Sequence, residues 1–181
     1  KKIAFHLDKE KIPYMIIGGQ AVLLYGSPRL TRDIDITLGL DTDKLFLIKN
    51  ICQKLQLKLL PKNADEFVKD TKVLPAEDQK LRIRVDFIFS FTFYEKQAIK
   101  RARKVSIENY AVKFASCEDV IIHKMFAGRM IDQEDVKNML LKNKNHLNFN
   151  YINKWLLEFS SIPEHKEIVD NFNDLLEQTG E

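Results

Sequence analysis

The feature that most constrains this chain is an apolar segment that ends in two glycines and is followed by a segment carrying two acids. Residues 14–17 read YMII, and Gly18-Gly19 follow them directly. Residues 31–38 then read TRDIDITL. Because successive residues of a strand point to opposite faces, Asp33 and Asp35 share one face. These patterns predict a buried strand, a glycine turn, and a second strand with one acidic face.

The two aspartates suggest a cation site. Carboxylates this close repel each other, and burying either one uncompensated is costly, so a divalent cation would relieve both problems. Mg²⁺ prefers hard oxygen ligands, and a third acid from another strand would complete its site. Asp86, in the strand-like segment RIRVDFIF, is the candidate, because it lies on the polar side of an otherwise apolar strand. A lone D-x-D pair is more often a solvated strand face, so the context decides.

That context is Gly18-Gly19, which immediately precede a helical segment expected at residues 20–25. Glycines allow a phosphate to approach the backbone closely, and the first N–H groups of a helix are free to bind it. An anion site beside a cation site is what a nucleoside triphosphate with its metal requires. A tight turn between strand and helix explains the glycines equally well.

Hydrophobic periodicity predicts a mixed sheet with helices, followed by helices alone. The expected strands cover residues 14–17, 31–38, 56–60, 81–89, 105–108 and 112–115. Helices are expected at 3–11, 20–25, 41–55 and 92–101, and then from Ser116 onward, at 132–141, at 150–159 and after Pro163. Residues 62–80 are polar and poorly periodic, which predicts a variable loop or hairpin. The sequence thus predicts an α+β fold with a core at 1–115 and a C-terminal helical portion at 116–181.

Composition narrows the class of protein without naming its partner. The 181 residues are 45% hydrophobic and 30% charged, which is typical of a globular domain. The net charge of +3 neither requires nor excludes a nucleic acid. Cys52 and Cys117 are far apart and outside any metal-binding motif, which favours a reducing cytoplasm. The sequence predicts neither a signal peptide nor a membrane-spanning segment of about 20 apolar residues.

The order Gly18-Gly19, Gly26, Arg29-x-Thr31 and Asp33-Ile34-Asp35 resembles the signature of the nucleotidyltransferase (polymerase β-like) superfamily. More narrowly, it resembles the AbiEii-type and related minimal nucleotidyltransferases, whose members include toxins of toxin–antitoxin pairs. Residues 116–136, SCEDVIIHKMFAGRMIDQEDV, are similar to the helical part of that group, which carries a Lys, an Arg and an Asp in a similar pattern. The resemblance covers residues 14 to about 141.

The resemblance implies the nucleotidyltransferase fold, a mixed sheet flanked by helices, and an enzyme that transfers a nucleoside monophosphate from an NTP such as ATP to a hydroxyl. It implies Mg²⁺ as the cofactor, with two ions about 3.5–4 Å apart that clamp the attacking and leaving oxygens. Asp33, Asp35 and Asp86 would be both the metal ligands and the catalytic residues. Asp86 would also help to accept the proton of the acceptor hydroxyl.

The resemblance also implies nucleotide contacts at Gly18, Gly19, Arg29, Thr31 and Lys124. Arg29 is equally well explained as a surface charge, and Lys124 as a lysine at the rim of an apolar helix face. Asp132 is expected to cap the helix that follows it. The superfamily often has a serine after the glycine of the first strand. Here Gln20 follows Gly19, which leaves the triphosphate contact to backbone N–H groups.

Several functions remain open on the sequence alone. The acceptor hydroxyl could belong to the 3′ end of an RNA such as tRNA, to a protein side chain, or to a small molecule such as an aminoglycoside. A toxin-like member would also have a cognate antitoxin as its partner. The alternative from another class is a non-catalytic protein that uses the same scaffold for binding or regulation. A kinase or phosphohydrolase is disfavoured, because the sequence contains no GxxxxGK[ST] motif.

Overall fold

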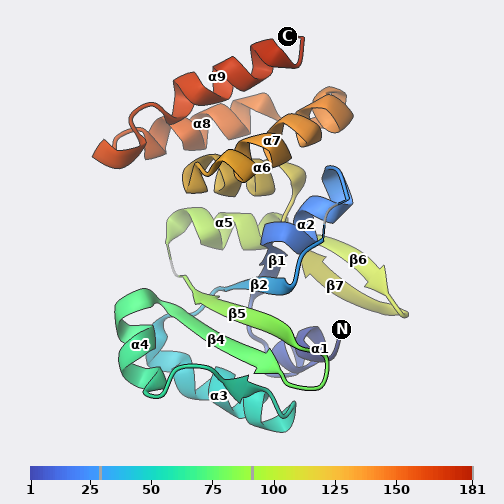
Figure 1. Cartoon of the computed structure of the whole chain (residues 1–181), viewed down its shortest axis with the longest axis vertical. Coiled ribbons are helices and arrows are strands. Elements are labelled where there is room, and N and C mark those ends of the chain that lie inside the picture. Colours follow the sequence, from blue (N-terminus) through green and yellow to red (C-terminus); the bar gives the residue numbers. More distant parts are fainter. Residues whose placement is uncertain (29, 91, 181) are drawn as a thin grey trace. The chain divides into compact units, whose positions relative to one another are not determined.

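The computed structural model describes residues 1–28, 30–90 and 92–180, which form an α+β fold (Figure 1). The strands are β1 (Tyr14–Ile17), β2 (Asp33–Leu38), β3 (Lys58–Leu59), β4 (Val73–Asp78), β5 (Ile83–Phe89), β6 (Arg103–Ile107) and β7 (Tyr110–Phe114). Within the described residues they form one mixed seven-stranded sheet in the order β3-β4-β5-β2-β1-β7-β6. The central strand β2 runs antiparallel to β1 and parallel to β5. The predicted fold class is therefore confirmed.

The helices also follow the predicted pattern over most of the chain. They are α1 (Lys2–Lys9), α2 (Gly18–Tyr25), α3 (Leu45–Lys54), α4 (Ala64–Thr71), α5 (Phe93–Arg101), α6 (Cys117–Ala127), α7 (Met130–Asn143), α8 (Phe149–Phe159) and α9 (Ile168–Gln178). Each helix in the described part of the chain is too short or too polar to cross a lipid bilayer.

The described residues separate into two compact units. The first comprises Lys1–Gln20 and Leu30–Ala115 and contains the whole sheet. The second comprises Ala21–Arg29 and Ser116–Glu181 and contains α6 to α9. Sequence analysis assigned residues 21–28 to the core, whereas their contacts group them with the helical unit.

The first unit has its core on one face of the sheet. Alternation along β2 and β5 turns Ile36, Leu38, Val85 and Phe87 to this face, and each is at most 2% exposed. Helices α1, α3 and α4 lie together on one side of the sheet (Figure 1). They contribute further buried side chains, among them Leu7, Ile48, Ile51 and Val68. On the opposite face β2 and β5 carry mostly polar residues, and the candidate site lies there: Asp33, Asp35, Thr37, Arg84 and Asp86, with Ile88 as the apolar exception.

The prediction of a loop or simple hairpin at residues 62–80 is wrong, because this segment forms α4 and β4. Asn63 caps α4 by accepting a hydrogen bond from the backbone N–H of Glu66, and its amide donates to the Glu66 carboxylate. This N-x-x-E pattern resembles a capping box, and it is the sequence signal from which the start of α4 could have been predicted. The proline at position 75 concealed the strand, because proline is rare inside sheets. Pro75 is tolerated because β3, its neighbour on one side, is only two residues long.

The second unit is built around α6. Ser116 caps this helix as predicted, since its hydroxyl accepts a hydrogen bond from the backbone N–H of Asp119. The Asp119 carboxylate also accepts a hydrogen bond of 2.8 Å from the Tyr151 hydroxyl of α8. The prediction that Asp132 caps the next helix is wrong. Helix α7 begins at Met130, so Asp132 lies within its first turn.

Candidate active site

The register of β2 and β5 brings the three predicted acids onto one face of the sheet. These strands are parallel, and Asp35 lies directly beside Asp86, while Asp33 lies beside Arg84. Residues opposite each other on adjacent strands point to the same face, as do residues two apart on one strand. Asp33, Asp35 and Asp86 therefore share the face opposite the core. We call Asp33, Asp35, Arg84 and Asp86 together the acidic face.

The glycine turn after β1 lies directly against this acidic face. Ile17, the last residue of β1, pairs with Asp35, and Gly18 has φ of +63°. A Cβ atom added at Gly18 would overlap Oδ2 of Asp35, and one added at Gly19 would lie 2.6 Å from Oγ1 of Thr31. Both positions therefore need glycine for steric reasons, and Gly18 also needs it for its left-handed backbone. The first residues of α2 thus come close to Asp35.

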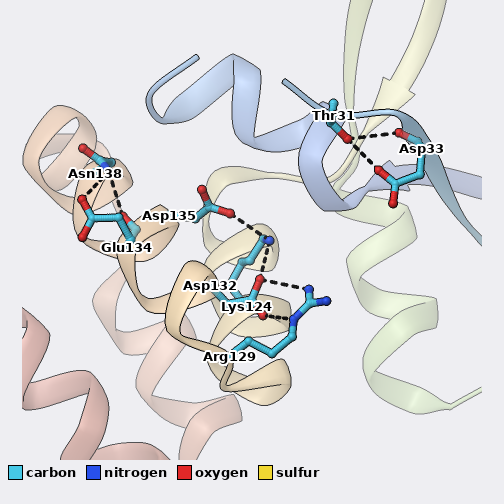
Figure 2. A network of polar contacts seen from close by, with 8 residues as sticks. All are labelled: Thr31, Asp33, Lys124, Arg129, Asp132, Glu134, Asp135 and Asn138. Carbon is cyan, nitrogen blue, oxygen red and sulfur yellow. Dashed lines mark hydrogen bonds and ion pairs between the residues drawn. The ribbon is translucent and has the colours of Figure 1, made fainter. Parts of the chain in front are cut away.

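Thr31 and Asp33 form the second local contact of the site. The Thr31 hydroxyl donates a hydrogen bond of 2.6 Å to Oδ1 of Asp33 (Figure 2). This bond fixes the orientation of an otherwise exposed carboxylate. Sequence analysis assigned Thr31 to the nucleotide; that contact stays a prediction, and the described contact of its hydroxyl is with Asp33. Arg29, the other predicted nucleotide ligand in this loop, lies outside the described residues.

Arg84 is the residue of this face that sequence analysis did not single out. Its guanidinium Nε donates a hydrogen bond of 2.8 Å to Oδ1 of Asp86. That hydrogen bond, together with the negative charges of Asp86, Asp33 and Asp35, raises the pKa of Arg84 above its ordinary value. The signal was present in the sequence, because Arg84 is two residues before Asp86 and therefore on the same face.

The acidic face fits Mg²⁺ in the kind of ligand it offers. Its carboxylates are hard oxygen donors on adjacent strands, and the glycine at position 18 leaves room for the Asp35 carboxylate where a Cβ would displace it. Their side chains are not gathered around one point. Among residues 1–28, 30–90 and 92–180, no three His, Cys, Asp or Glu side chains are placed to hold one ion together. Asp33 and Asp86 are instead turned toward Thr31 and Arg84.

Lys124, the remaining predicted nucleotide ligand, belongs to a buried charge cluster in the helical unit (Figure 2). Its ammonium donates to Oδ1 of Asp132 at 2.5 Å and lies 2.9 Å from Oδ2 of Asp135. Arg129 adds two hydrogen bonds to the Asp132 carboxylate, of 2.5 and 3.2 Å. We call Lys124, Arg129, Asp132 and Asp135 the buried ion cluster.

The buried ion cluster is electrically balanced, with two cations and two carboxylates. The side chains of Lys124, Asp132 and Asp135 are only 6%, 0% and 7% exposed. Burial alone would raise the pKa of Asp132, but the hydrogen bonds from Arg129 and Lys124 hold this pKa below its ordinary value. A buried pair of this kind is strongly destabilising to break, because its partner is left as an uncompensated charge. The described contacts thus give Lys124 a structural role.

Comparison with known proteins gives the context for this site. Residues 1–177 match the family described as nucleotidyltransferase of unknown function (DUF6036). No curated protein matches the sequence. Three solved structures show the same fold at low sequence identity.

The antibiotic-resistance factor ANT(2″)-Ia is 17% identical with a TM-score of 0.61, over 92% of this chain and 91% of that one. The lincosamide antibiotic adenylyltransferase LnuA is 16% identical with a TM-score of 0.52, over 77% and 95% of the two chains. An antigenic nucleotidyltransferase-like protein from Paracoccidioides brasiliensis is 18% identical with a TM-score of 0.54, over 93% and 89%. These similarities show the fold, and the match over residues 1–177 shows the family: the chain belongs to the nucleotidyltransferases of unknown function (DUF6036).

Proposed function

We propose that this protein is a Mg²⁺-dependent nucleotidyltransferase that transfers a nucleoside monophosphate from an NTP to an acceptor hydroxyl. The observation that carries the proposal is the register of β2 and β5, which places Asp35 beside Asp86 and Asp33 on the same face. The Gly18-Gly19 turn against Asp35 adds a backbone that a triphosphate can approach closely. Family membership supplies the class of reaction.

The roles of the residues follow from their positions. Asp33, Asp35 and Asp86 would hold the metal, and Thr31 would keep the Asp33 carboxylate oriented toward it. When bound, Mg²⁺ neutralises the charge of the triphosphate and lowers the pKa of the acceptor hydroxyl. Asp86 is the residue we assign to accept the hydroxyl proton. The backbone N–H groups that begin α2 would contact the phosphates, because Gln20 follows Gly19 in place of the serine that the resemblance leads us to expect.

The predicted nucleotide contacts of Gly18, Gly19, Thr31, Arg29 and Lys124 all remain predictions. Arg29 precedes the acidic strand and would contact phosphate from there. Lys124 would need to leave Asp132 and Asp135, with which its ammonium is paired in the second unit. The proposal does not depend on either cation.

The proposed acceptor is a hydroxyl group, and three classes of molecule could carry it: a small molecule, an RNA or a protein. ANT(2″)-Ia is an antibiotic-resistance factor and LnuA a lincosamide antibiotic adenylyltransferase, and this chain resembles both in fold over at least nine-tenths of their length. A small-molecule hydroxyl is therefore the first acceptor to test. An RNA 3′ end or a protein hydroxyl would instead support a toxin-like, AbiEii-type role with a cognate antitoxin.

The test is transfer of label from each α-³²P-labelled NTP in the presence of Mg²⁺. Parallel reactions would contain an aminoglycoside and lincosamide mixture, total cellular RNA, or total cellular protein. We expect label on one acceptor class with the wild type and none with the Asp35→Asn variant. Equal labelling by the two proteins would contradict the assignment of the acidic face as the active site.

A non-catalytic scaffold is the second candidate, and one observation favours it. No three metal-ligating side chains in the described parts of the chain are gathered around one point, and Asp86 is paired with Arg84. If the protein is such a scaffold, calorimetry should detect no Mg²⁺-dependent binding of NTP. If it is the enzyme, calorimetry should detect clear binding.

A further inference from the structure

Arg84 is a cation placed among the acids of the proposed metal site. Its neighbour on β2 is Asp33, its neighbour on β4 is Glu77, and its hydrogen-bond partner two residues along β5 is Asp86. All four side chains belong to the same face of the sheet, by strand alternation and register. A positive charge in this position competes directly with any metal ion that the same carboxylates would bind.

We propose that Arg84 is an internal counter-cation of the acidic face: it holds Asp86 in the metal-free protein, and Asp86 exchanges the guanidinium for the divalent ion when the metal binds. The inference rests on the proposed function, because it concerns the same acids. It assigns Arg84 as a positioning residue that sets the affinity of the site for metal through Asp86.

The charge of the site supports this role. Asp33, Asp35 and Asp86 carry three negative charges close together, which is unfavourable without a nearby cation. Arg84 offsets one of these charges through its 2.8 Å hydrogen bond to Asp86. For the three proposed ligands alone, two negative charges then remain, which is the charge of one divalent ion; Glu77, on the same face, adds a further negative charge.

Of the two partners in this ion pair, Arg84 is the one that can move. The Arg84 side chain is 53% exposed, while that of Asp86 is only 15% exposed. The guanidinium can therefore turn into water with its hydration restored, whereas Asp86 stays on the sheet. An ion pair with one half-exposed member contributes little to stability, because solvent screens it. Releasing Arg84 is thus a small cost beside the binding of a divalent ion by several carboxylates.

The ion pair with Arg84 also explains why the three acids do not converge on one point. The three acids share a face, yet no three metal-ligating side chains in the described residues are gathered around one point. Asp86 is turned toward Arg84 by its 2.8 Å hydrogen bond. Rotation of Asp86 away from Arg84 would bring its carboxylate back toward Asp35, its register partner.

The test measures Mn²⁺ binding in the absence of nucleotide. The electron paramagnetic resonance signal of free Mn²⁺ gives the amount that is not bound. We expect the Kd of the Arg84→Gln variant to be about tenfold lower than that of the wild type, because a unit positive charge close to the ion has been removed. Arg84→Lys keeps the charge and should bind Mn²⁺ about as the wild type does. Arg103→Gln is the matched control, since Arg103 is an exposed strand residue on β6, at the opposite edge of the sheet, and its affinity should be unchanged.

A second pair of variants tests whether Arg84 acts through Asp86. In the Asp86→Asn background, Arg84→Gln should change the Kd much less than it does in the wild type, because the exchanging partner is gone. An equal, tenfold effect in both backgrounds would overturn the exchange, because Arg84 would then act only as a distant charge. Circular dichroism of each variant checks that the fold is retained.

The remaining outcomes separate this inference from the proposed function. Wild-type binding that Asp35→Asn abolishes and Arg84→Gln leaves unchanged or weakens would overturn the counter-cation role alone. Absence of Mn²⁺ binding by the wild-type protein would overturn the metal site itself, and the inference with it. Tighter binding by Arg84→Gln, with Arg103→Gln unchanged, is the result that the proposal predicts.

Discussion

The acidic face of the first unit and the buried ion cluster of the second each combine acids with cations, yet they have opposite physical characters. The buried ion cluster has two cations and two carboxylates; Lys124, Asp132 and Asp135 are almost fully enclosed, while the Arg129 side chain is 70% exposed. The acidic face has three carboxylates to one guanidinium, and Arg84 is half exposed. Charges that are balanced and enclosed stabilise a fold only while all partners remain, whereas unbalanced, accessible acids attract a cation from outside.

The comparison predicts that substitutions in the two regions separate activity from stability. The largest expected effect is on catalysis. Asp35→Asn should reduce nucleotidyl transfer by about a thousandfold, because one metal-ligand charge is lost where charge stabilisation dominates the barrier. The melting temperature should change little, since the acids of this face repel one another. Transfer assays with thermal unfolding of the same samples test this, and a variant with unaltered turnover contradicts it.

The second prediction concerns the buried ion cluster. Lys124→Met should reduce the free energy of unfolding by about 3–5 kcal/mol, because Asp132 and Asp135 lose their shared ammonium partner inside the protein. Lys166→Met is the matched control, since Lys166 is an exposed lysine of the same unit and should change stability by less than about 0.5 kcal/mol. Urea denaturation measures both. Equal stability of the two variants would remove the structural role of Lys124 and favour its role toward the nucleotide.

The third prediction concerns the dependence of folding stability on pH, which we expect to come in part from a histidine of the second unit. Burial lowers the pKa of His123 on α6 to about 4, against the attraction of Asp119. The unfolded chain then binds more protons than the folded one between pH 6.5 and 4. The stability due to neutral His123 is therefore complete above pH 6.5 and is lost as pH falls to 4, by about 3 kcal/mol in total.

Urea denaturation between pH 7 and pH 4.5 measures this loss, and His123→Gln should flatten the dependence on pH. His146→Gln is the control, because His146 is an exposed histidine of the same unit. A dependence that persists unchanged in His123→Gln would show that other groups cause it.

The smallest effect is expected at Thr31. Thr31→Val removes the 2.6 Å hydrogen bond that orients Asp33, on an exposed part of the acidic face. Stability should fall by no more than about 1 kcal/mol, because such bonds contribute little net energy. Transfer should fall several-fold through the misoriented carboxylate. Thr42→Val removes a similar exposed bond to Asp41 away from the site and should leave transfer unchanged. Equal transfer by both variants would show that Thr31 does not position Asp33.

The sequence was sufficient to predict those strands in which one local pattern of residues is strong. The strand YMII is observed at the predicted residues, and the alternation of β2 and β5 correctly placed Asp33, Asp35 and Asp86 on polar faces. The register between β2 and β5 could not be read from the sequence, because the paired residues, such as Asp35 and Asp86, are 51 positions apart in the chain. That register is what makes Asp35 and Asp86 neighbours.

The predictions were weakest where long-range contacts override local preference. Pro75 argued against a strand, yet β4 accommodates it beside the very short β3. The ion pairs of Lys124 with Asp132 and Asp135 were not foreseen, because these partners lie on the next helix and only the turn between α6 and α7 brings them together. Its contact with the nucleotide stays a prediction. The orientation of Asp86 toward Arg84 likewise depends on side-chain positions that periodicity does not specify.

The central claim, that the acidic face holds Mg²⁺ together with a nucleoside triphosphate, is tested most directly by calorimetric titration of non-hydrolysable NTP analogues into the whole chain. The account predicts binding of at least one analogue in the presence of Mg²⁺, strong weakening when EDTA removes the metal, and loss in Asp35→Asn with the fold intact. Binding of equal strength with and without Mg²⁺, or unchanged in Asp35→Asn, would contradict it.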